Sequence, residues 1–235
     1  MPITRRDLLA LLSSSTFFFT LSQTRVLAAQ LPDDSAPLEF PQGVASGDPQ
    51  PDGVMLWTRA VPVSATEGPV NVLVQISKDR DFSTVLLQAQ LTTNAGSDYT
   101  VRGHINGLDP DTQYFYRFLG GDSNGEPSVS RTGRTRTAPE QGQPRRVNLA
   151  FASCQNYEQA YYGSWARMLA DDRAAAEEDR IQFVLHLGDF IYEQVWFELP
   201  DGSPTPRTFA PFPNGVENEK NRYAVSLADY RHLYK

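Results

Sequence analysis

Three side chains that could bind a metal ion follow two apolar segments in the second half of the chain. Asp189 and Tyr192 belong to the run Gly188-Asp189-Phe190-Ile191-Tyr192, and Cys154 ends an earlier apolar run. A carboxylate has two oxygens and can bridge two cations, and a phenolate three residues later can reach the same ion if the chain turns. Such hard oxygen donors suit trivalent iron or hard divalent ions, and a thiolate adds a soft negative ligand. These residues therefore predict a metal site.

Each of these side chains also has an ordinary structural role that competes with metal binding. A lone cysteine is usually a small apolar residue, an aspartate at a strand end can cap the next turn, and a tyrosine more often packs against its neighbours. His186 is expected to be a structural or supporting group rather than a ligand. Three polar residues are the candidates to support the ligands: His186, Glu193 and Asn156.

The composition narrows the choice of ligands and excludes one class of protein. The chain has 235 residues with three histidines and one cysteine, so a histidine-rich metal cage and an intrachain disulfide are both excluded. The formal net charge is −7, whereas a nucleic-acid-binding surface needs basic residues to pair with phosphates. We therefore expect no nucleic-acid-binding surface.

A strand, a helix and a second strand are expected to position the three candidate ligands. Residues 146–154 are typical of a strand that ends in a turn, residues 165–178 of an amphipathic helix, and residues 181–187 of a central parallel strand buried on both faces. Ligands of open α/β sheets gather at the carboxyl ends of such strands. Cys154 and Asp189 both lie at these ends, where they could share one ion.

The segment before this unit is rich in short strands. Turn residues separate the runs, and several runs alternate apolar and polar residues, as half-buried strands do. The predicted strands are 53–58, 70–76, 85–91 and 99–105. The spacing favours a β-sandwich. Gly120–Gly125 is typical of a hairpin turn, and residues 139–145 of a linker.

One part of the predicted sandwich resembles the tyrosine-corner segment of fibronectin type III domains. It runs Gly107-Leu108-Asp109-Pro110 and continues into a strand that begins near Tyr114. By this resemblance, Tyr114 would be a buried tyrosine whose hydroxyl bonds to the preceding backbone. The fold expected is thus an N-terminal fibronectin type III-like β-sandwich over residues 38–138, followed by an α/β domain over residues 146–235.

The first 29 residues have the features of an export signal. Arg5 and Arg6 precede an apolar run, and small residues near Ala28 offer a cleavage site. The run Thr4-Arg5-Arg6-Asp7-Leu8-Leu9 resembles the twin-arginine motif. We expect export through the twin-arginine machinery to the periplasm or the extracellular space. No apolar run is long enough to span a membrane stably.

Three motifs together resemble the PhoD-like alkaline phosphatases. They are the runs 40–49 with 54–59, 151–157 with Cys154, and 185–193 with Asp189 and Tyr192. The wider relatives of that family, the purple acid phosphatases, share the Gly-Asp-x-x-Tyr pattern. The resemblance implies a hydrolase of phosphomonoesters or phosphodiesters that uses Fe³⁺ and Ca²⁺. It also implies that Cys154, Asp189 and Tyr192 are iron ligands, with Asp189 bridging to calcium.

The chemistry implied by this resemblance is hydrolysis by a metal-bound hydroxide, for which no nucleophilic serine is needed. A dinuclear centre needs more donors than these three, and the family takes the others from segments that have no counterpart here. We therefore expect residues 146–235 to be an incomplete α/β metallophosphatase domain, truncated and inactive alone. A secreted, non-enzymatic binding protein with a decayed catalytic remnant is the alternative.

Overall fold

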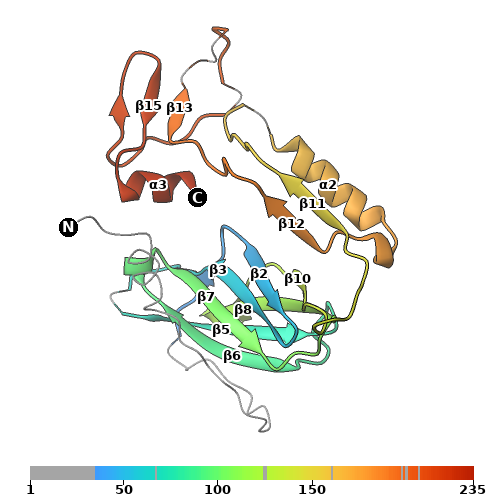
Figure 1. Cartoon of the computed structure of the whole chain (residues 1–235). Coiled ribbons are helices and arrows are strands. Elements are labelled where there is room, and N and C mark those ends of the chain that lie inside the picture. The colour runs from blue at the N-terminus through green and yellow to red at the C-terminus, as the bar shows by residue number, and fades with distance from the viewer. Residues whose placement is uncertain are drawn as a thin grey trace, which may run out of the picture. The chain divides into compact units, whose positions relative to one another are not determined.

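The computed structural model describes residues 35–235 except 67, 124–125, 160, 197, 199–200 and 206, so the predicted export signal lies outside the described residues. The chain divides into two compact units, with the break between Pro144 and Arg145. This break falls inside the predicted linker 139–145. Figure 1 shows the mainly β-sheet character of the chain. No helix in the described part is long and apolar enough to cross a membrane.

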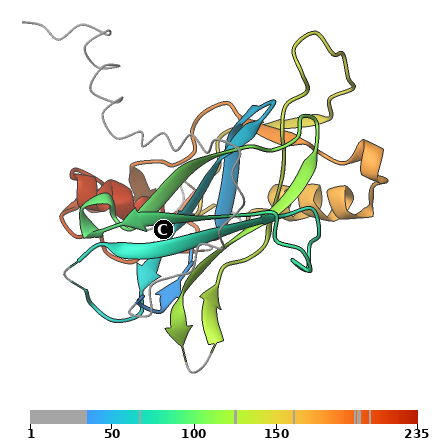
Figure 2. The same cartoon turned by 90° about the horizontal axis from the view of Figure 1, so that it is seen from below.

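Two antiparallel sheets form the first unit. One has the order β2-β3-β7 and the other the order β10-β8-β5-β6, with β9 also paired to β8. Figure 2 shows the same strands, coloured blue to green, from below. The bounds are β2 Val44–Gln50, β3 Gly53–Arg59, β5 Val70–Ser77, β6 Leu87–Thr93, β7 Thr100–Asn106, β8 Gln113–Ser123, β9 Glu126–Val129 and β10 Gly133–Arg136. The short strands β1 (Leu38–Glu39) and β4 (Val61–Pro62) pair separately, and η1 (Ala95–Ser97) is a 3₁₀ turn.

The core of this unit lies between the two sheets. Alternate residues of β3 and β7 face alternate residues of β5 and β8, because successive side chains of a strand point to opposite sides. The cluster includes residues from both sheets: Val54, Leu56, Val72, Val74, Ile76, Val101, Ile105, Tyr116 and Phe118. The predicted strands are therefore present, with bounds shifted by one or two residues, and they form a sandwich.

Tyr114 makes the bond that the tyrosine-corner resemblance predicts. Its side chain is 1% exposed, and its hydroxyl accepts a hydrogen bond of 2.8 Å from the backbone N–H of Asp109. Burial is the largest cause of a raised pKa for this phenol. The hydroxyl therefore satisfies an amide that the turn would otherwise leave without a partner.

Replacing Tyr114 by phenylalanine is expected to lower the free energy of unfolding of the first unit by about 1 kcal/mol, because the Asp109 amide loses its acceptor while the packing stays. Chemical denaturation measures this loss. Tyr99→Phe, in the same unit, is the matched control and is expected to change the free energy little. Equal losses in the two variants would contradict the assigned role of the Tyr114 hydroxyl.

The predicted turn at Gly120–Gly125 begins too early. Strand β8 continues to Ser123 and pairs with β9, so Gly120 and Gly121 lie within the strand. The N–H of Gly121 donates to the carbonyl of Ala36 at 2.9 Å, and a Cβ on Gly121 would overlap the carbonyl oxygen of Ser35. Gly121 therefore allows two backbones to approach closely, and Gly120 leaves room for the Leu38 side chain, which are other uses of glycine in strands.

The second unit begins with the expected strand, helix and parallel strand. Strand β11 (Leu149–Ala152) is followed by helix α2 (Gly163–Ala174) and by β12 (Phe183–His186), which pairs with β11 in parallel. The helix ends four residues earlier than predicted, and a 3₁₀ turn, η2 (Glu177–Asp179), follows it. No residue of α2 is buried, so its predicted apolar stripe is only half-covered.

The prediction that residues 181–187 form a strand buried on both faces is wrong for this chain. Leu149 pairs with Phe183 and Phe151 with Leu185, so these four side chains share one face of the sheet. They are 46–69% exposed, because β11 is the one strand paired with β12 among the described residues. We call this surface the apolar sheet face: Leu149, Phe151, Phe183 and Leu185.

The C-terminal part of the second unit is a small antiparallel sheet and a short helix. The sheet has the order β13 (Gln194–Trp196), β15 (Asn221–Tyr223), β14 (Val216–Glu217), and α3 spans Leu227–Leu233. Arg222 pairs in the sheet, and Ser226 caps α3 in a reciprocal capping box with Asp229, so the helix begins at Leu227. The buried Asp229 also accepts from the N–H groups of Asn214 and Val225.

Candidate metal centre

Two loops run side by side beyond the ends of β11 and β12. The N–H of Cys154 donates to the carbonyl of Gly188, and the N–H of Gln155 to that of Asp189, both at 3.1 Å. Cys154 and Asp189 have φ values of 57° and 51°, in the left-handed region that residues other than glycine enter rarely. Aspartate tolerates this conformation better than most residues, and cysteine has no such advantage. Paired backbone outliers of this kind are typical of functional sites.

These left-handed turns bring the three predicted ligands together. The thiol of Cys154 donates to Oδ2 of Asp189 at 3.3 Å, and the hydroxyl of Tyr192 donates to the same oxygen at 3.3 Å. Cys154 and Asp189 are exposed, and Tyr192 is half-buried. The side chains thus meet at one point, as the strand-end argument expected, while their role as ligands stays a prediction. We call them the ligand cluster: Cys154, Asp189 and Tyr192.

The phenol of Tyr192 is protonated at neutral pH in this arrangement. Its hydrogen bond with Cys154, followed by desolvation and the negative charge of Asp189, raises the pKa of Tyr192 to about 12. The phenol therefore acts as a hydrogen-bond donor to the Asp189 carboxylate. A cation that bound the Asp189 carboxylate in place of these donors would have to displace the protons of Tyr192 and Cys154.

The donor set fits a hard metal ion. A carboxylate, a phenol and a thiol meet within hydrogen-bond distance at an accessible point, and all three become negative ligands when deprotonated. Among the described residues, no three side chains of His, Cys, Asp or Glu come together in a way that could hold a metal. The described cluster therefore depends on the phenol of Tyr192 as its third donor.

Two sequence models of one phosphatase family match the chain. The N-terminal domain of PhoD-like phosphatases matches residues 26–139, and the PhoD-like phosphatase domain matches residues 149–235. The chain belongs to the PhoD-like phosphatase family. Cys154, Asp189 and Tyr192 all lie in the part matched by the second model.

An alkaline phosphatase and a solved structure are each similar to most of this chain. The chain is 31% identical to alkaline phosphatase D of Bacillus subtilis (strain 168) in a 201-residue alignment that covers 83% of this chain and 30% of that protein. A solved structure of PhoD is 29% identical, with a TM-score of 0.64 over 87% of this chain and 36% of its own. The chain thus spans about a third of the length of these relatives. A fibronectin type III domain from human KIAA0970 protein also matches, at a TM-score of 0.30 that supports no argument.

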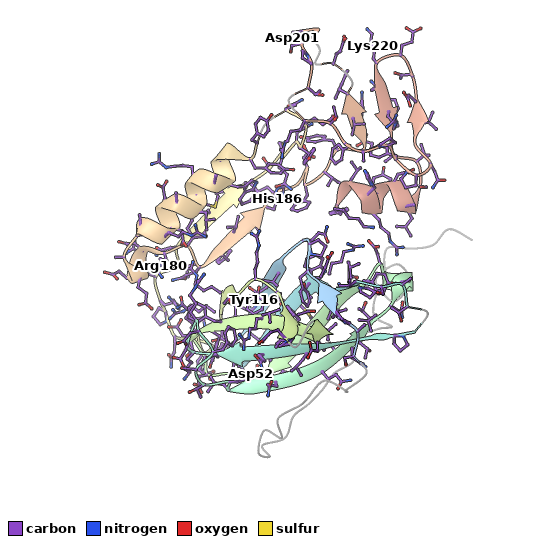
Figure 3. The ribbon with its side chains drawn as sticks, turned by 180° about the vertical axis from the view of Figure 1, so that it is seen from behind. Asp52, Tyr116, Arg180, His186, Asp201 and Lys220 are labelled. Carbon is purple, nitrogen blue, oxygen red and sulfur yellow. The ribbon has the colours of Figure 1, made fainter. Side chains whose placement is uncertain are left out.

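The three predicted supporting residues do not contact the ligand cluster through their side chains in the described interactions. His186, at the end of β12 (Figure 3), stacks on Trp165 with ring centroids 6.3 Å apart, and its Nδ1 accepts from the N–H of Gly188 at 3.4 Å. Asn156 accepts from the N–H of Glu158 at 2.8 Å and so shapes its own loop. Glu193 is exposed, and its carbonyl accepts from the N–H of Ala224.

Sequence reasoning missed several residues that hold this region together. The carboxylate of Glu158, 2% exposed, accepts from the N–H of Trp196 at 2.8 Å; burial raises the pKa of Glu158, and this bond partly opposes the rise. The guanidinium of Arg207 lies 4.0–5.1 Å from the ring centroids of Tyr157, Tyr161 and Tyr162. A run of nearby tyrosines was the available signal, but its cationic partner is more than 40 residues away in the sequence.

A hollow next to the cluster is too small for a phosphoester. Its volume is about 20 Å³, roughly what one water molecule requires. Tyr192, Asn156, Tyr157, Phe190 and Phe209 are among its lining residues.

Proposed function

We propose that this chain carries the first ligands of the metal centre of a phosphoric ester hydrolase. Cys154, Asp189 and Tyr192 would hold ferric iron, and Asp189 would also contribute to a calcium site. The observation that carries the proposal is the meeting of the thiol and the phenol at one oxygen of Asp189, in a chain of the PhoD-like family. Phosphomonoesters or phosphodiesters would be the substrates.

The chain's own residues would bind and orient the metals, and none of them would attack phosphorus. When bound, the two metals would supply an acidified water for attack on phosphorus and positive charge for the phosphoryl oxygens. The left-handed turns at Cys154 and Asp189 hold the ligands at the exposed ends of β11 and β12. No serine or other covalent nucleophile is needed.

Activity would require more donors than the described residues bring together. A centre with two cations needs further carboxylate or imidazole ligands, and the described cluster has three side chains. We infer that residues 146–235 form the first part of an α/β metallophosphatase domain and that the chain is inactive without the missing ligands. The sandwich, residues 38–138, would be fibronectin type III-like and serve as a packing or positioning module.

The export prediction complements this proposal. A twin-arginine signal at residues 1–29 would carry the folded protein to the periplasm or the extracellular space. The twin-arginine machinery and a phosphoester would then be its partners. The acidic chain has no sequence feature of a nucleic-acid-binding protein.

Purified protein loaded with Fe³⁺ is expected to show a visible absorption band from charge transfer between the Tyr192 phenolate and the iron. Tyr192→Phe should abolish this band, because the variant keeps the ring and loses the donor oxygen. Tyr157→Phe, in the neighbouring loop, is the matched control and should leave the band unchanged. Absorption spectroscopy with measured iron content tests both.

Two results would contradict the proposal. One is a wild-type protein that binds no iron, which would favour the non-enzymatic binding protein. The other is a colourless, iron-free, chelator-insensitive preparation that still hydrolyses p-nitrophenyl phosphate, which would exclude the mechanism.

A further inference from the structure

We propose that Gln155 and Trp165 are positioning residues for the ligand cluster and that they act by holding the turn that carries Asp189. The inference rests on the proposed metal-binding role of the cluster. Neither residue touches a ligand through its side chain in the described interactions. Their effect would come from the backbone of the turn between Gly188 and Phe190.

Gln155 binds two consecutive carbonyls of this turn. Its backbone N–H donates to the carbonyl of Asp189 at 3.1 Å, and its side-chain Nε2 donates to the carbonyl of Phe190 at 3.0 Å. The N–H of Cys154 already donates to the carbonyl of Gly188. The carbonyls of Gly188, Asp189 and Phe190 in one loop therefore accept hydrogen bonds from Cys154 and Gln155 in the other. The side-chain amide of Gln155 makes the last of these three bonds.

Trp165 fixes the orientation of the Gln155 amide. The indole Nε1–H donates to Oε1 of Gln155 at 3.1 Å, and the indole ring also stacks on His186 at the end of β12. An indole can only donate and a backbone carbonyl can only accept, so the amide must present its oxygen to Trp165 and its nitrogen to Phe190. Only an amide of this length satisfies both partners. The tryptophan belongs to α2, so the support comes from a regular element rather than from a loop.

The turn requires such support because of its backbone conformation. Gly188 has φ of 127° and Asp189 has φ of 51°, so two consecutive residues have positive φ. A strained conformation persists when the surrounding contacts determine it fully. If the Gln155 amide is lost, the Phe190 carbonyl can bind water instead. The fold is then retained, while the Asp189 carboxylate is held less closely to Cys154 and Tyr192.

A titration with Co²⁺ tests the inference, because cobalt thiolate bonds give an ultraviolet charge-transfer band that reports on Cys154. Gln155→Met, which keeps the length and removes both hydrogen bonds, is expected to weaken Co²⁺ binding by about 10- to 100-fold, the usual effect of losing a group that orients a ligand. Gln155→Glu should weaken binding as well, since its carboxylate faces the Phe190 carbonyl. Trp165→Phe should weaken it less, because the ring can still stack on His186.

The matched control is Gln159→Met in the same loop. Gln159 is exposed, and its described contact is the donation of its backbone N–H to Asn156, so Co²⁺ affinity should be unchanged. A second readout is independent of metal. The indole N–H resonance of Trp165, assigned by its loss in Trp165→Phe, should shift in Gln155→Met and stay in place in Gln159→Met.

The outcomes separate this inference from the proposed function. If wild-type protein gives no cobalt thiolate band, the proposed metal site is wrong and this inference fails with it. If wild type binds and Gln155→Met binds equally well, the positioning role alone is overturned. If Gln155→Met does not fold, as judged by circular dichroism, Trp165→Phe decides: weaker binding with retained structure supports the role, and unchanged binding overturns it.

Discussion

Replacing Asp189 by asparagine is expected to abolish metal binding at the ligand cluster. The side chain loses its negative charge, and one of its two oxygens is replaced by an NH2 group that cannot bind a cation. The loss of affinity should exceed about 100-fold, since even residues that only orient a ligand can cost that much. A Co²⁺ titration and the iron content of the purified variant measure it.

Asp189→Asn tests the carboxylate itself, because the backbone of the turn should not change. Asparagine tolerates left-handed φ about as well as aspartate, so the turn at φ of 51° should be kept. Glu193→Gln removes one negative charge four residues later from an exposed side chain and should bind metal like wild type. If Asp189→Asn also bound like wild type, the ligand role of Asp189 would be wrong.

Replacing Phe118 by alanine is expected to remove about 3–5 kcal/mol from the free energy of unfolding of the sandwich. Phe118 is fully buried on β8, pairs with Val74 of β5, and meets the ring of Tyr116 edge-on at 6.2 Å. Its loss would leave a large cavity between the two sheets. Chemical denaturation of the protein measures the effect.

Phe115→Ala is the matched control for this prediction. Phe115 lies on the same strand but on the opposite side, is half-buried, and has the guanidinium of Arg80 at 5.9 Å from its ring centroid. Its loss should cost about 1 kcal/mol, as for most substitutions outside a core. Similar losses at the two positions would contradict the placement of the core between the sheets.

Local patterns predicted much of the sandwich from the sequence. The alternation in residues 70–76 marks a strand because one side of it faces the core, and that core is formed by neighbouring strands of the same unit. Tyr114 could be assigned because its partner, Asp109, is five residues away. The turn predicted at Gly120 and Gly121 was wrong, because the sequence does not show that Leu38 lies against the first and the backbone of Ser35 and Ala36 against the second.

The meeting of Cys154, Asp189 and Tyr192 could be predicted from the sequence, whereas the residues that hold their loops could not. Strand ends place Cys154 and Asp189, because parallel strands end at the same edge of a sheet. Gln155 and Trp165 could not be assigned, since a hydrogen bond between an amide and an indole leaves no periodic pattern. The burial predicted for residues 181–187 failed because burial depends on what packs against a strand as well as on its composition.

The apolar sheet face has a consequence for the behaviour of the protein in solution. Leu149, Phe151, Phe183 and Leu185 form a water-exposed hydrophobic surface on a two-stranded sheet, and such surfaces favour contact between molecules. The net charge of −7 provides repulsion that opposes this contact and that added salt would screen. Colloidal stability, rather than the folding free energy of either unit, is therefore expected to set the highest concentration at which the protein stays free of aggregates.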